Sequence, residues 1–293
     1  MTLSRSGMDP KICVVTGATG GIGKWIALGM AQAGFHVVLV GRDAGRAAAA
    51  RLWIATKVPD AALEIMLADL SSMAETRALA RRLLVAHPRL DVLILNAGVF
   101  RARPGLTAEG HDVVLAVNYL SPFILMTALQ PALRAAAPSR IVTIGSSTSD
   151  RARLTAETVT APWRWNMLGA YARSKLAVMI ATFEVARRLE GSQVTANVVH
   201  PGAVASGLIR SGGVISLVWW LLSVFFKSER QGADTPIYLS LTPDLRATTG
   251  RYFKRRRIVR PNRLAHDARL ASEIWQTTEQ LLNPSGQSVP VDR

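Results

Sequence analysis

Tyr171 and Lys175 stand four positions apart in the stretch GAYARSKLAVMIATFEVARRL, which spans residues 169–189. The apolar pattern predicts a helix, and a spacing of four places both side chains on the same helical face. A tyrosine with its ordinary pKa of about 10 is a poor base at neutral pH. A neighbouring ammonium favours the phenolate and lowers that pKa, which prepares tyrosine for acid–base chemistry. A pair of surface residues gives the same pattern, so other parts of the chain must decide between the two interpretations.

A glycine-rich stretch, TGATGGIG, begins with Thr16 at the end of an apolar run and leads into a predicted helix. Gly17, Gly21 and Gly23 are spaced so that the chain can turn tightly and its backbone can approach a pyrophosphate. The following helix then directs its N-terminal amides at that anion. Glycines also occur in plain turns, but this position between a strand and a helix favours a dinucleotide-binding loop.

Short apolar runs alternate with helical segments through most of the chain. The predicted strands are 11–17, 35–41, 63–69, 90–96, 139–145 and 192–200. The predicted helices between them are 23–33, 43–56, 72–86, 109–135 and 170–190. Continuously apolar strands are typical of parallel sheets covered on both faces, so we expect an α/β fold with right-handed crossovers. After residue 205 the alternation stops, and less regular, helical sequence follows.

Composition narrows the class of protein. The chain has 293 residues, 49% of them hydrophobic, which is enough for one large domain with a sizeable core. Cys13 is the only cysteine, so we expect no disulfide framework and no metal site. The net charge is +15, with a basic cluster KRRRIVR at 254–260. Because no zinc-knuckle spacing, RNP-like motif or aromatic interleaving accompanies this cluster, we expect no nucleic-acid partner.

The longest apolar run, VISLVWWLLSVFF, covers residues 214–226. A helix of that length rises about 20 Å, too little to cross a bilayer core of about 30 Å. The first residues, MTLSRSGMDP, lack the apolar region of a secretory signal. We therefore predict a cytoplasmic protein. The apolar run is expected to be a lid over an apolar substrate, with its outer face resting on a membrane, whereas a buried core helix is the alternative.

Six motifs in this order resemble the short-chain dehydrogenase/reductase superfamily. They are TGATGGIG, LNAG at 95–98, VNYLSPF at 117–123, IVTIGSS at 141–147, YARSK at 171–175 and HPGAVAS at 200–206. The resemblance covers residues 11–283. HPG, ERQGAD at 229–234 and GRYF at 250–253 resemble its retinol dehydrogenase-like branch.

The resemblance implies a catalytic tetrad of Asn118, Ser146, Tyr171 and Lys175. Tyr171 would transfer the proton, Lys175 would support it and bind the nicotinamide ribose, and Ser146 would hold the substrate oxygen. Asn118 would anchor a water in a proton relay behind Lys175. The family usually carries two serines after the fifth strand, and here Gly145 takes the first place, which leaves Ser147 as an alternative to Ser146.

We predict NADP(H) as the cofactor. An NAD enzyme places an acidic residue after the second strand, whereas this chain has Arg42, which can pair with a 2′-phosphate. Asp43 is expected to be an N-terminal helix residue instead. The resemblance extends the cofactor site to residues near the glycine loop, the adenine, the ribose and the nicotinamide. The predicted cofactor-binding residues are Gly17, Thr19, Gly20, Gly21, Ile22, Gly23, Arg42, Asp69, Leu70, Asn96, Ala97, Gly98, Tyr171, Lys175, Pro201, Gly202, Val204 and Ser206.

We thus expect a single-domain, Rossmann-type doubly wound parallel sheet with a C-terminal helical substrate lid. Its parts are a dinucleotide-binding and catalytic core (11–205), a lid region (206–253) and a basic C-terminal segment and tail (254–293). The predicted function is NADP(H)-dependent interconversion of a carbonyl and an alcohol on an apolar small molecule, retinoid-, steroid- or polyketide-like. The alternatives are a non-catalytic dinucleotide sensor and a peripheral membrane-binding protein on the same fold. A homodimer is left open.

Overall fold

The computed structural model describes residues 10–160, 165–202 and 228–283. Within these ranges eight strands form one sheet in the order β3-β2-β1-β4-β5-β6-β7-β8. The strands are β1 (Ile12–Thr16), β2 (His36–Gly41), β3 (Leu63–Leu67), β4 (Val92–Leu95), β5 (Ser139–Ile144), β6 (Val194–His200), β7 (Tyr252–Lys254) and β8 (Arg257–Val259). All neighbouring strands pair in parallel except β7 and β8, which are antiparallel. The predicted α/β fold with a doubly wound parallel sheet is confirmed.

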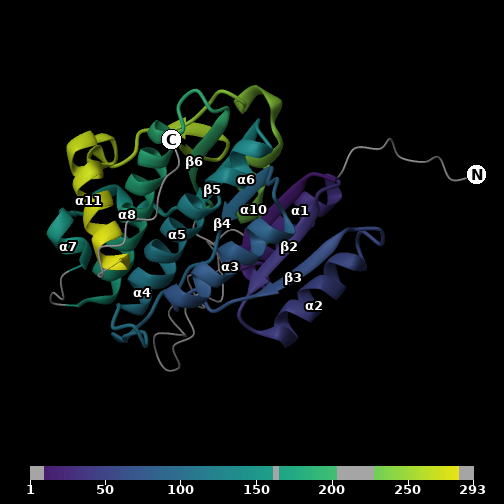
Figure 1. Cartoon of the computed structure of the whole chain (residues 1–293), viewed down its shortest axis with the longest axis horizontal. Helices are drawn as coiled ribbons and strands as arrows, with labels where there is room; N and C mark the ends of the chain where they lie inside the picture. The colour runs from purple at the N-terminus through teal and green to yellow at the C-terminus, as the bar shows by residue number, and fades with distance from the viewer. Residues whose placement is uncertain (1–9, 161–164, 203–227, 284–293) are drawn as a thin grey trace, which may run out of the picture.

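Helices cover both faces of this sheet, as Figure 1 shows. One face carries α1 (Gly21–Gln32), α2 (Ala44–Ala55) and α10 (Glu229–Leu241), and α1 packs against both of the others. The other face carries α3 (Met73–Ala86), α5 (Ser121–Ala128), α8 (Met167–Arg188) and α11 (Ala268–Leu282), which pack in that order. This arrangement explains why the central strands are apolar at nearly every position.

The sheet has one hydrophobic core on each face, and successive residues of a strand point into the two cores in turn. In β1, Cys13 and Val15 are fully buried against the α1 side, whereas Val14 is fully buried against the α3 side. In β4, Leu93 and Ile94 alternate in the same way. Two-faced burial of this kind requires apolar side chains on both sides of the pleat, so the sheet orients its loops from a rigid centre.

The segment predicted as one helix over 109–135 is instead divided. It consists of α4 (Val113–Leu115), a π-helical turn η1 (Ala116–Leu120), α5 and α6 (Gln130–Ala135). Pro122 and Pro131 each lie in the first turn of one of these helices, where a missing backbone N–H costs least. The π-helical turn contains Asn118, and such turns occur often at functional sites.

In the described ranges, several short elements also follow β5. They are η2 (Ser147–Arg151), α7 (Ala156–Thr160), η4 (Pro243–Leu245) and η5 (Arg263–His266). The strand order reverses between β1 and β4, and the carboxyl ends of these strands carry the glycine loop and Asn96. Ligands of open α/β sheets bind in the crevice at such a switch point.

Part of the predicted lid region lies in the body of the protein. Residues 229–241 form α10, which packs on α1, and residues 252–254 form β7 within the sheet. The apolar run 214–226 lies outside the described residues. In the predicted basic C-terminal segment, the amphipathic α11 buries Trp275 against Phe123 at a ring distance of 4.6 Å.

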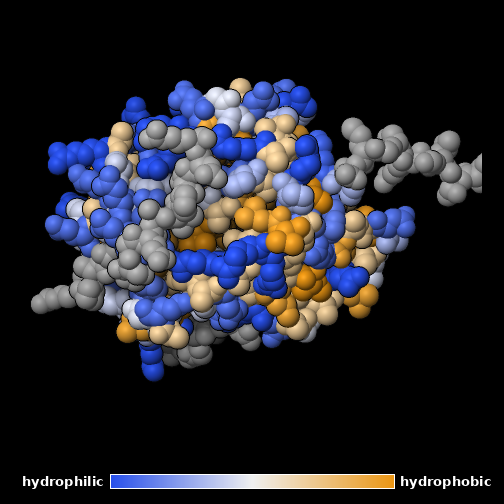
Figure 2. All heavy atoms as spheres, viewed as in Figure 1, coloured by the Kyte–Doolittle hydropathy of each residue, from blue (hydrophilic) through white to orange (hydrophobic). Residues whose placement is uncertain are grey.

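The surface is unevenly divided between polar and apolar residues. Figure 2 shows apolar side chains gathered on the side of β2 and β3, whereas the side of α8 and α11 is mainly hydrophilic. β3 is an edge strand, and its last residue, Leu67, is 39% exposed. In the described ranges, no helix combines the length and apolar character needed to span a membrane.

Candidate active site

The glycine loop between β1 and α1 has the geometry of a phosphate cradle. Gly17 and Gly21 have φ angles of 66° and 55°, a region that side chains disfavour. A Cβ added to Gly23 would lie 2.2 Å from the Gly17 carbonyl oxygen and 2.4 Å from Asn96 Nδ2. The loop therefore needs glycine at these positions in order to close against the end of β4.

Thr16 and Asn96 hold this loop in place. The Thr16 hydroxyl oxygen accepts hydrogen bonds from the backbone amides of Asn96 and Ala97 at 2.9 and 3.0 Å. Asn96 Nδ2 donates to the Thr16 carbonyl at 2.9 Å. Gly20, at the N-cap of α1, provides no side-chain cap, so the first amides of this twelve-residue helix are not bound by it. These residues fit a dinucleotide pyrophosphate.

Arg42 lies beside a shallow depression of about 370 Å³ at the carboxyl ends of β2 and β3. The preceding Gly41 is required by packing, because a Cβ there would lie 2.4 Å from Thr19 Cγ2 in the glycine loop. Asp43 is the N-cap of α2, and its carboxylate accepts from the Arg46 amide at 2.7 Å. The predicted assignment of Asp43 to the helix start is confirmed. This leaves Arg42 as an exposed cation at the rim of the depression.

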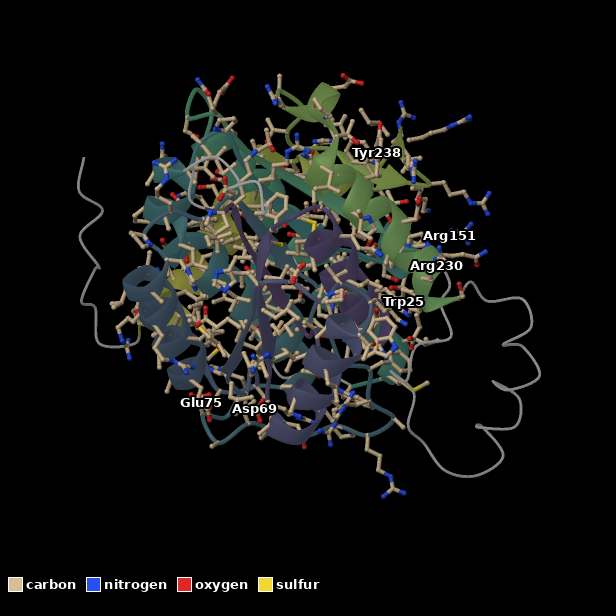
Figure 3. All side chains as sticks on the ribbon, turned by 90° about the vertical axis from the view of Figure 1, so that its right-hand side faces the viewer. Trp25, Asp69, Glu75, Arg151, Arg230 and Tyr238 are labelled. Carbon is tan, nitrogen blue, oxygen red and sulfur yellow. The ribbon has the colours of Figure 1, made fainter. Side chains whose placement is uncertain are left out.

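The carboxylates of Asp69 and Glu75 line the same depression, and both accept hydrogen bonds from neighbouring groups. Glu75 Oε2 accepts from the Asp69 amide at 2.8 Å, and Asp69 Oδ1 accepts from the amide and hydroxyl of Ser71. Figure 3 shows Asp69 and Glu75 close together at one end of the molecule. Leu70, the other half of the predicted adenine-contacting pair, is buried in the core beside them.

Arg46 is a candidate that the sequence analysis missed. A Cβ on Gly20 would lie 2.9 Å from Arg46 Nη2, so this guanidinium sits over the glycine loop. Arg46 comes four residues after Arg42, on the first turn of α2. The available signal was a second arginine at the start of the helix that follows Arg42.

Tyr171 and Ser146 meet at the carboxyl end of β5. Tyr171 is in α8, which starts at Met167 and is capped by Asn166, whose side chain accepts from the Gly169 amide at 2.6 Å. Burial raises the pKa of Tyr171 above its ordinary value, and a hydrogen bond with Ser146 opposes that rise. Ser147 is exposed, so the geometry favours Ser146 as the serine that faces the tyrosine.

Lys175 is 4% exposed, and its ammonium donates to the Ile144 carbonyl at 2.9 Å. Burial lowers the pKa of Lys175 to about 8. The sequence argument expected the lysine to lower the pKa of Tyr171. In the structure that expectation is wrong, because the desolvation of the buried phenol dominates and its pKa moves upward. Tyr171 is therefore a protonated phenol at neutral pH.

The side chain of Asn118 braces the segment after β4. Its Oδ1 accepts from the Val99 amide at 2.7 Å, and its Nδ2 donates to the Val99 carbonyl and to the Ser174 hydroxyl at 2.9 and 3.0 Å. A Cβ on Gly98 would lie 3.4 Å from both Asn118 Oδ1 and Lys175 Nζ. Asn118, Gly98 and Lys175 are thus brought together, whereas the predicted water relay stays a prediction.

Phe100 is a second residue that the sequence analysis missed. Its ring meets the Tyr171 ring edge to face, with centroids 5.1 Å apart. It follows the N-A-G motif by two positions, at the end of the segment that Asn118 holds. An aromatic residue shortly after that motif was the available signal. Phe100 gives the reactive tyrosine an apolar neighbour.

The remaining predicted residues divide into two groups. Pro201 and Gly202 lie at the end of β6, where Gly202 has a φ of 99°. Val204 and Ser206 lie outside the described residues. Among the residues that the structure describes, no group of three His, Cys, Asp or Glu side chains could hold a metal ion.

Comparison with known proteins places these features in context. Residues 11–212 match the family model for short chain dehydrogenases. The chain is 36% identical to human retinol dehydrogenase 11 over 282 residues, which cover 96% of this chain and 87% of that protein. A crystal structure of a Mycobacterium Paratuberculosis protein matches with a TM-score of 0.72 and 26% identity, and covers 93% of each chain. A Burkholderia cenocepacia short chain dehydrogenase in complex with NADP matches with a TM-score of 0.66 and 26% identity, over 83% of this chain and 95% of that one.

Proposed function

Because the chain belongs to the short-chain dehydrogenase/reductase family, in its retinol dehydrogenase-like branch, we propose that it is an NADP(H)-dependent oxidoreductase for an apolar small molecule. Family membership makes it an oxidoreductase that interconverts carbonyl and alcohol groups with a nicotinamide dinucleotide. The proposal adds the phosphorylated cofactor, the apolar substrate and the roles of individual residues. The observation that carries it is the contact of Tyr171 with Ser146 beside the buried Lys175.

The proposed mechanism assigns one task to each side chain. The bound dinucleotide would supply or accept the hydride at the substrate carbon. Ser146 would donate a hydrogen bond to the substrate oxygen and hold it near the phenol of Tyr171. Tyr171 would deliver its proton to that oxygen during reduction and take it back during oxidation. The raised pKa of Tyr171 supports the first role, because the proton is present at neutral pH.

Lys175 would act beside the tyrosine rather than on the substrate. Its ammonium lies 5.8 Å from the centre of the Tyr171 ring, and with a pKa of about 8 it is mainly charged at pH 7. A positive charge at that distance stabilises the phenolate left after proton transfer. Asn118 would support both residues through its hydrogen bonds to Val99 and Ser174.

The preference for NADP(H) is supported by the charges around the ribose end of the site. Arg42 is exposed at the depression, and the Arg46 guanidinium lies over Gly20. Asp43 and Asp69 accept hydrogen bonds from neighbouring amides. Two guanidinium groups with five N–H donors each suit a 2′-phosphate, which a carboxylate after β2 would repel.

An apolar substrate is proposed from the surroundings of the tyrosine. The half-buried ring of Tyr171 packs edge to face against Phe100, so a substrate carbonyl near Ser146 would meet an aromatic wall. Human retinol dehydrogenase 11, by its name, acts on retinol, and we extend to this chain only the apolar class of compound. The proposed lid, which includes the apolar run, would cover the rest of the substrate.

The alternative functions are a dinucleotide sensor and a peripheral membrane protein. The contact of Tyr171 with Ser146 beside the buried Lys175 favours the enzyme over the sensor, because sensing needs no such proton donor. The basic cluster at 254–260 offers limited support for membrane contact. Lys254 pairs with Asp150, and Arg256 pairs with Asp234, so two of its cations are already partnered. Cytoplasmic location, membrane contact and a homodimer stay predictions.

The proposed function is tested by following NADPH absorbance at 340 nm with apolar aldehydes and ketones of increasing length. We expect turnover of at least one such substrate, faster with NADPH than with NADH, and loss of turnover in Tyr171→Phe. Tight NADPH binding with no turnover across the panel and in the reverse direction would favour the sensor.

A further inference from the structure

The turn that carries Ser146 is fastened to a distant part of the chain. Ser146 caps η2, a five-residue 3₁₀ helix, and its carbonyl accepts from the amide and hydroxyl of Ser149 at 3.1 and 2.6 Å. Ser149 is completely buried. A 3₁₀ turn has poor hydrogen-bond geometry and little stability of its own. The position of Ser146 therefore depends on what holds Ser149.

Asn262 holds that residue. Its Nδ2 donates to the Ser149 carbonyl at 2.8 Å and to the Ala152 carbonyl at 2.9 Å. Its Oδ1 accepts from the Leu264 amide at 3.0 Å, which fixes the side chain at the start of η5. Asn262 is only 6% exposed. The two amide protons thus bind the middle and the C-terminal end of η2, and the amide oxygen binds the start of η5.

A second contact fastens the same turn from the same side. Asp150 follows Ser149 directly and forms an ion pair with Lys254 of β7 at 3.0 Å. Both side chains are about one-third exposed, so this pair alone is a weak constraint. Asn262 is the buried attachment, and with two hydrogen bonds to η2 it is the stronger constraint.

We propose that Asn262 is a positioning residue for Ser146, acting through Ser149. This inference rests on the proposed function, in which Ser146 holds the substrate oxygen. A displacement of about 1 Å in a positioning group costs on the order of 10²-fold in rate. Loss of Asn262 is therefore expected to lower kcat by about 10- to 100-fold, while NADPH binding at the distant glycine loop changes little.

Asn197 offers a matched control. It is also 6% exposed, and its amide likewise braces the C-terminal region, with Nδ2 donating to the Thr248 carbonyl and Oδ1 accepting from the Arg251 amide. Within the described residues its side chain forms no hydrogen bond with η2. Asn197→Ala removes the same kind of buried side chain and reports the general cost to stability. We expect it to lower the melting temperature as Asn262→Ala does, and to leave kcat much closer to that of the unmodified chain.

The first experiment is a double-mutant cycle with Ser146→Ala. If Asn262 acts through Ser146, Asn262→Ala lowers kcat in the natural background and has little further effect when Ser146 is already alanine. Asn197→Ala should give equal effects in both backgrounds. Additive losses for Asn262 and Ser146 would overturn the proposal. If Asn262→Ala does not fold, Asn262→Ser, which keeps one donor, is measured in the same cycle.

The second experiment does not require turnover. Cys13 is fully buried and is the sole cysteine, so Ser146→Cys creates one accessible thiol. Its rate of alkylation by iodoacetamide reports how firmly the turn is held. We expect this rate to rise several-fold with Asn262→Ala and to stay unchanged with Asn197→Ala. Equal rates in the two variants would contradict the proposal. A chain that turned over no carbonyl or alcohol would contradict only the proposed function.

Discussion

Lys175 and Tyr171 rise from one face of α8, yet each is attached to a different point of the β5 end. The Lys175 ammonium donates to the carbonyl of Ile144, the last residue of β5, whereas the Tyr171 phenol contacts Ser146 two residues further on. The lysine ammonium lies 5.8 Å from the centre of the tyrosine ring. The end of β5 therefore brings together the proposed acid, its electrostatic partner and the serine that would orient the substrate.

Tyr171→Phe removes the phenol and keeps the ring that packs against Phe100. Turnover should fall by at least the ~10²–10⁴-fold typical of losing an acid–base group. The affinity for NADPH should change little, because the glycine loop and Arg42 are unaffected. Steady-state rates and a fluorescence titration with NADPH measure the two effects. Near-normal rates on several substrates would exclude Tyr171 as the proton donor.

The pH dependence of reduction should show an alkaline decline near pH 8. Lys175, with a pKa lowered to about 8, loses its charge there, whereas Tyr171, with a raised pKa, keeps its proton to higher pH. The profile of kcat/KM reports ionisations of the free enzyme, and the two neighbouring groups titrate as a pair. We expect a plateau from about pH 6 to 7.5 and then a decline as the ammonium is lost.

The same profile separates this assignment from its alternatives. A limb below pH 7 would mean that a group other than Lys175 controls the rate. A plateau extending beyond pH 10 would mean that the charge of Lys175 is not needed. Lys175→Arg, which retains a positive charge to higher pH, should move the decline upward if the variant retains measurable activity.

The sequence was sufficient to predict the six parallel strands and the motifs, and it was insufficient for the electrostatics. Strands such as β1 and β4 are apolar throughout because they are buried on both faces, and this leaves a clear pattern. β7 and β8 were missed because each has only three residues, too few to show a period. The pairing of β7 with β6 is decided by contacts that are distant in sequence.

The sequence also led to the wrong direction for the pKa shift of Tyr171. A spacing of four residues shows which side chains share a helical face, but it does not show how deeply the face is buried. In the structure α8 packs against α5 and α11, and desolvation of the phenol outweighs the opposing hydrogen bond with Ser146. Asn262 also leaves no signal in the sequence, because its partners are Ser149 and Ala152, more than a hundred positions earlier.

Arg42→Ala should erode the preference for NADPH over NADH. Its guanidinium lies at the depression after β2, and we expect the KM for NADPH to rise by about 10-fold or more, as for one charge-assisted pair lost. Arg46→Ala should act in the same direction, since its guanidinium lies over Gly20. NADH kinetics should stay nearly constant in both variants.

Arg51→Ala is the matched control for this prediction. Arg51 is an exposed arginine on the same helix, α2, and lies outside the residues that line the depression. Its removal changes the net charge of the protein by the same amount. Equal changes in the KM for NADPH in the Arg42 and Arg51 variants would indicate a general effect of charge rather than recognition of the 2′-phosphate.

The lid prediction concerns Trp219 and Leu222, which lie outside the described residues. Replacing both with serine should raise the KM for long apolar substrates and leave that for short ones and for NADPH nearly unchanged. The physical reason is the loss of apolar area that would cover the far end of a long substrate. Unchanged KM values for every substrate, or a protein that no longer folds, would favour the core-helix alternative.

Gly23→Ala should abolish dinucleotide binding while the rest of the fold persists. The added methyl would lie 2.2 Å from the Gly17 carbonyl oxygen and 2.4 Å from Asn96 Nδ2, both of which belong to the closed loop. Neither the Gly17 carbonyl nor the Asn96 side chain can move away without opening the cradle. The amides of α1 would therefore move away from the pyrophosphate.

Gly45→Ala is the control, because its added methyl would meet only Asp43 Oδ1, at an ordinary 3.5 Å. Titration with NADPH should show binding for Gly45→Ala and none for Gly23→Ala, with circular dichroism spectra alike. If Gly23→Ala bound NADPH normally, the loop between β1 and α1 would not be the phosphate cradle.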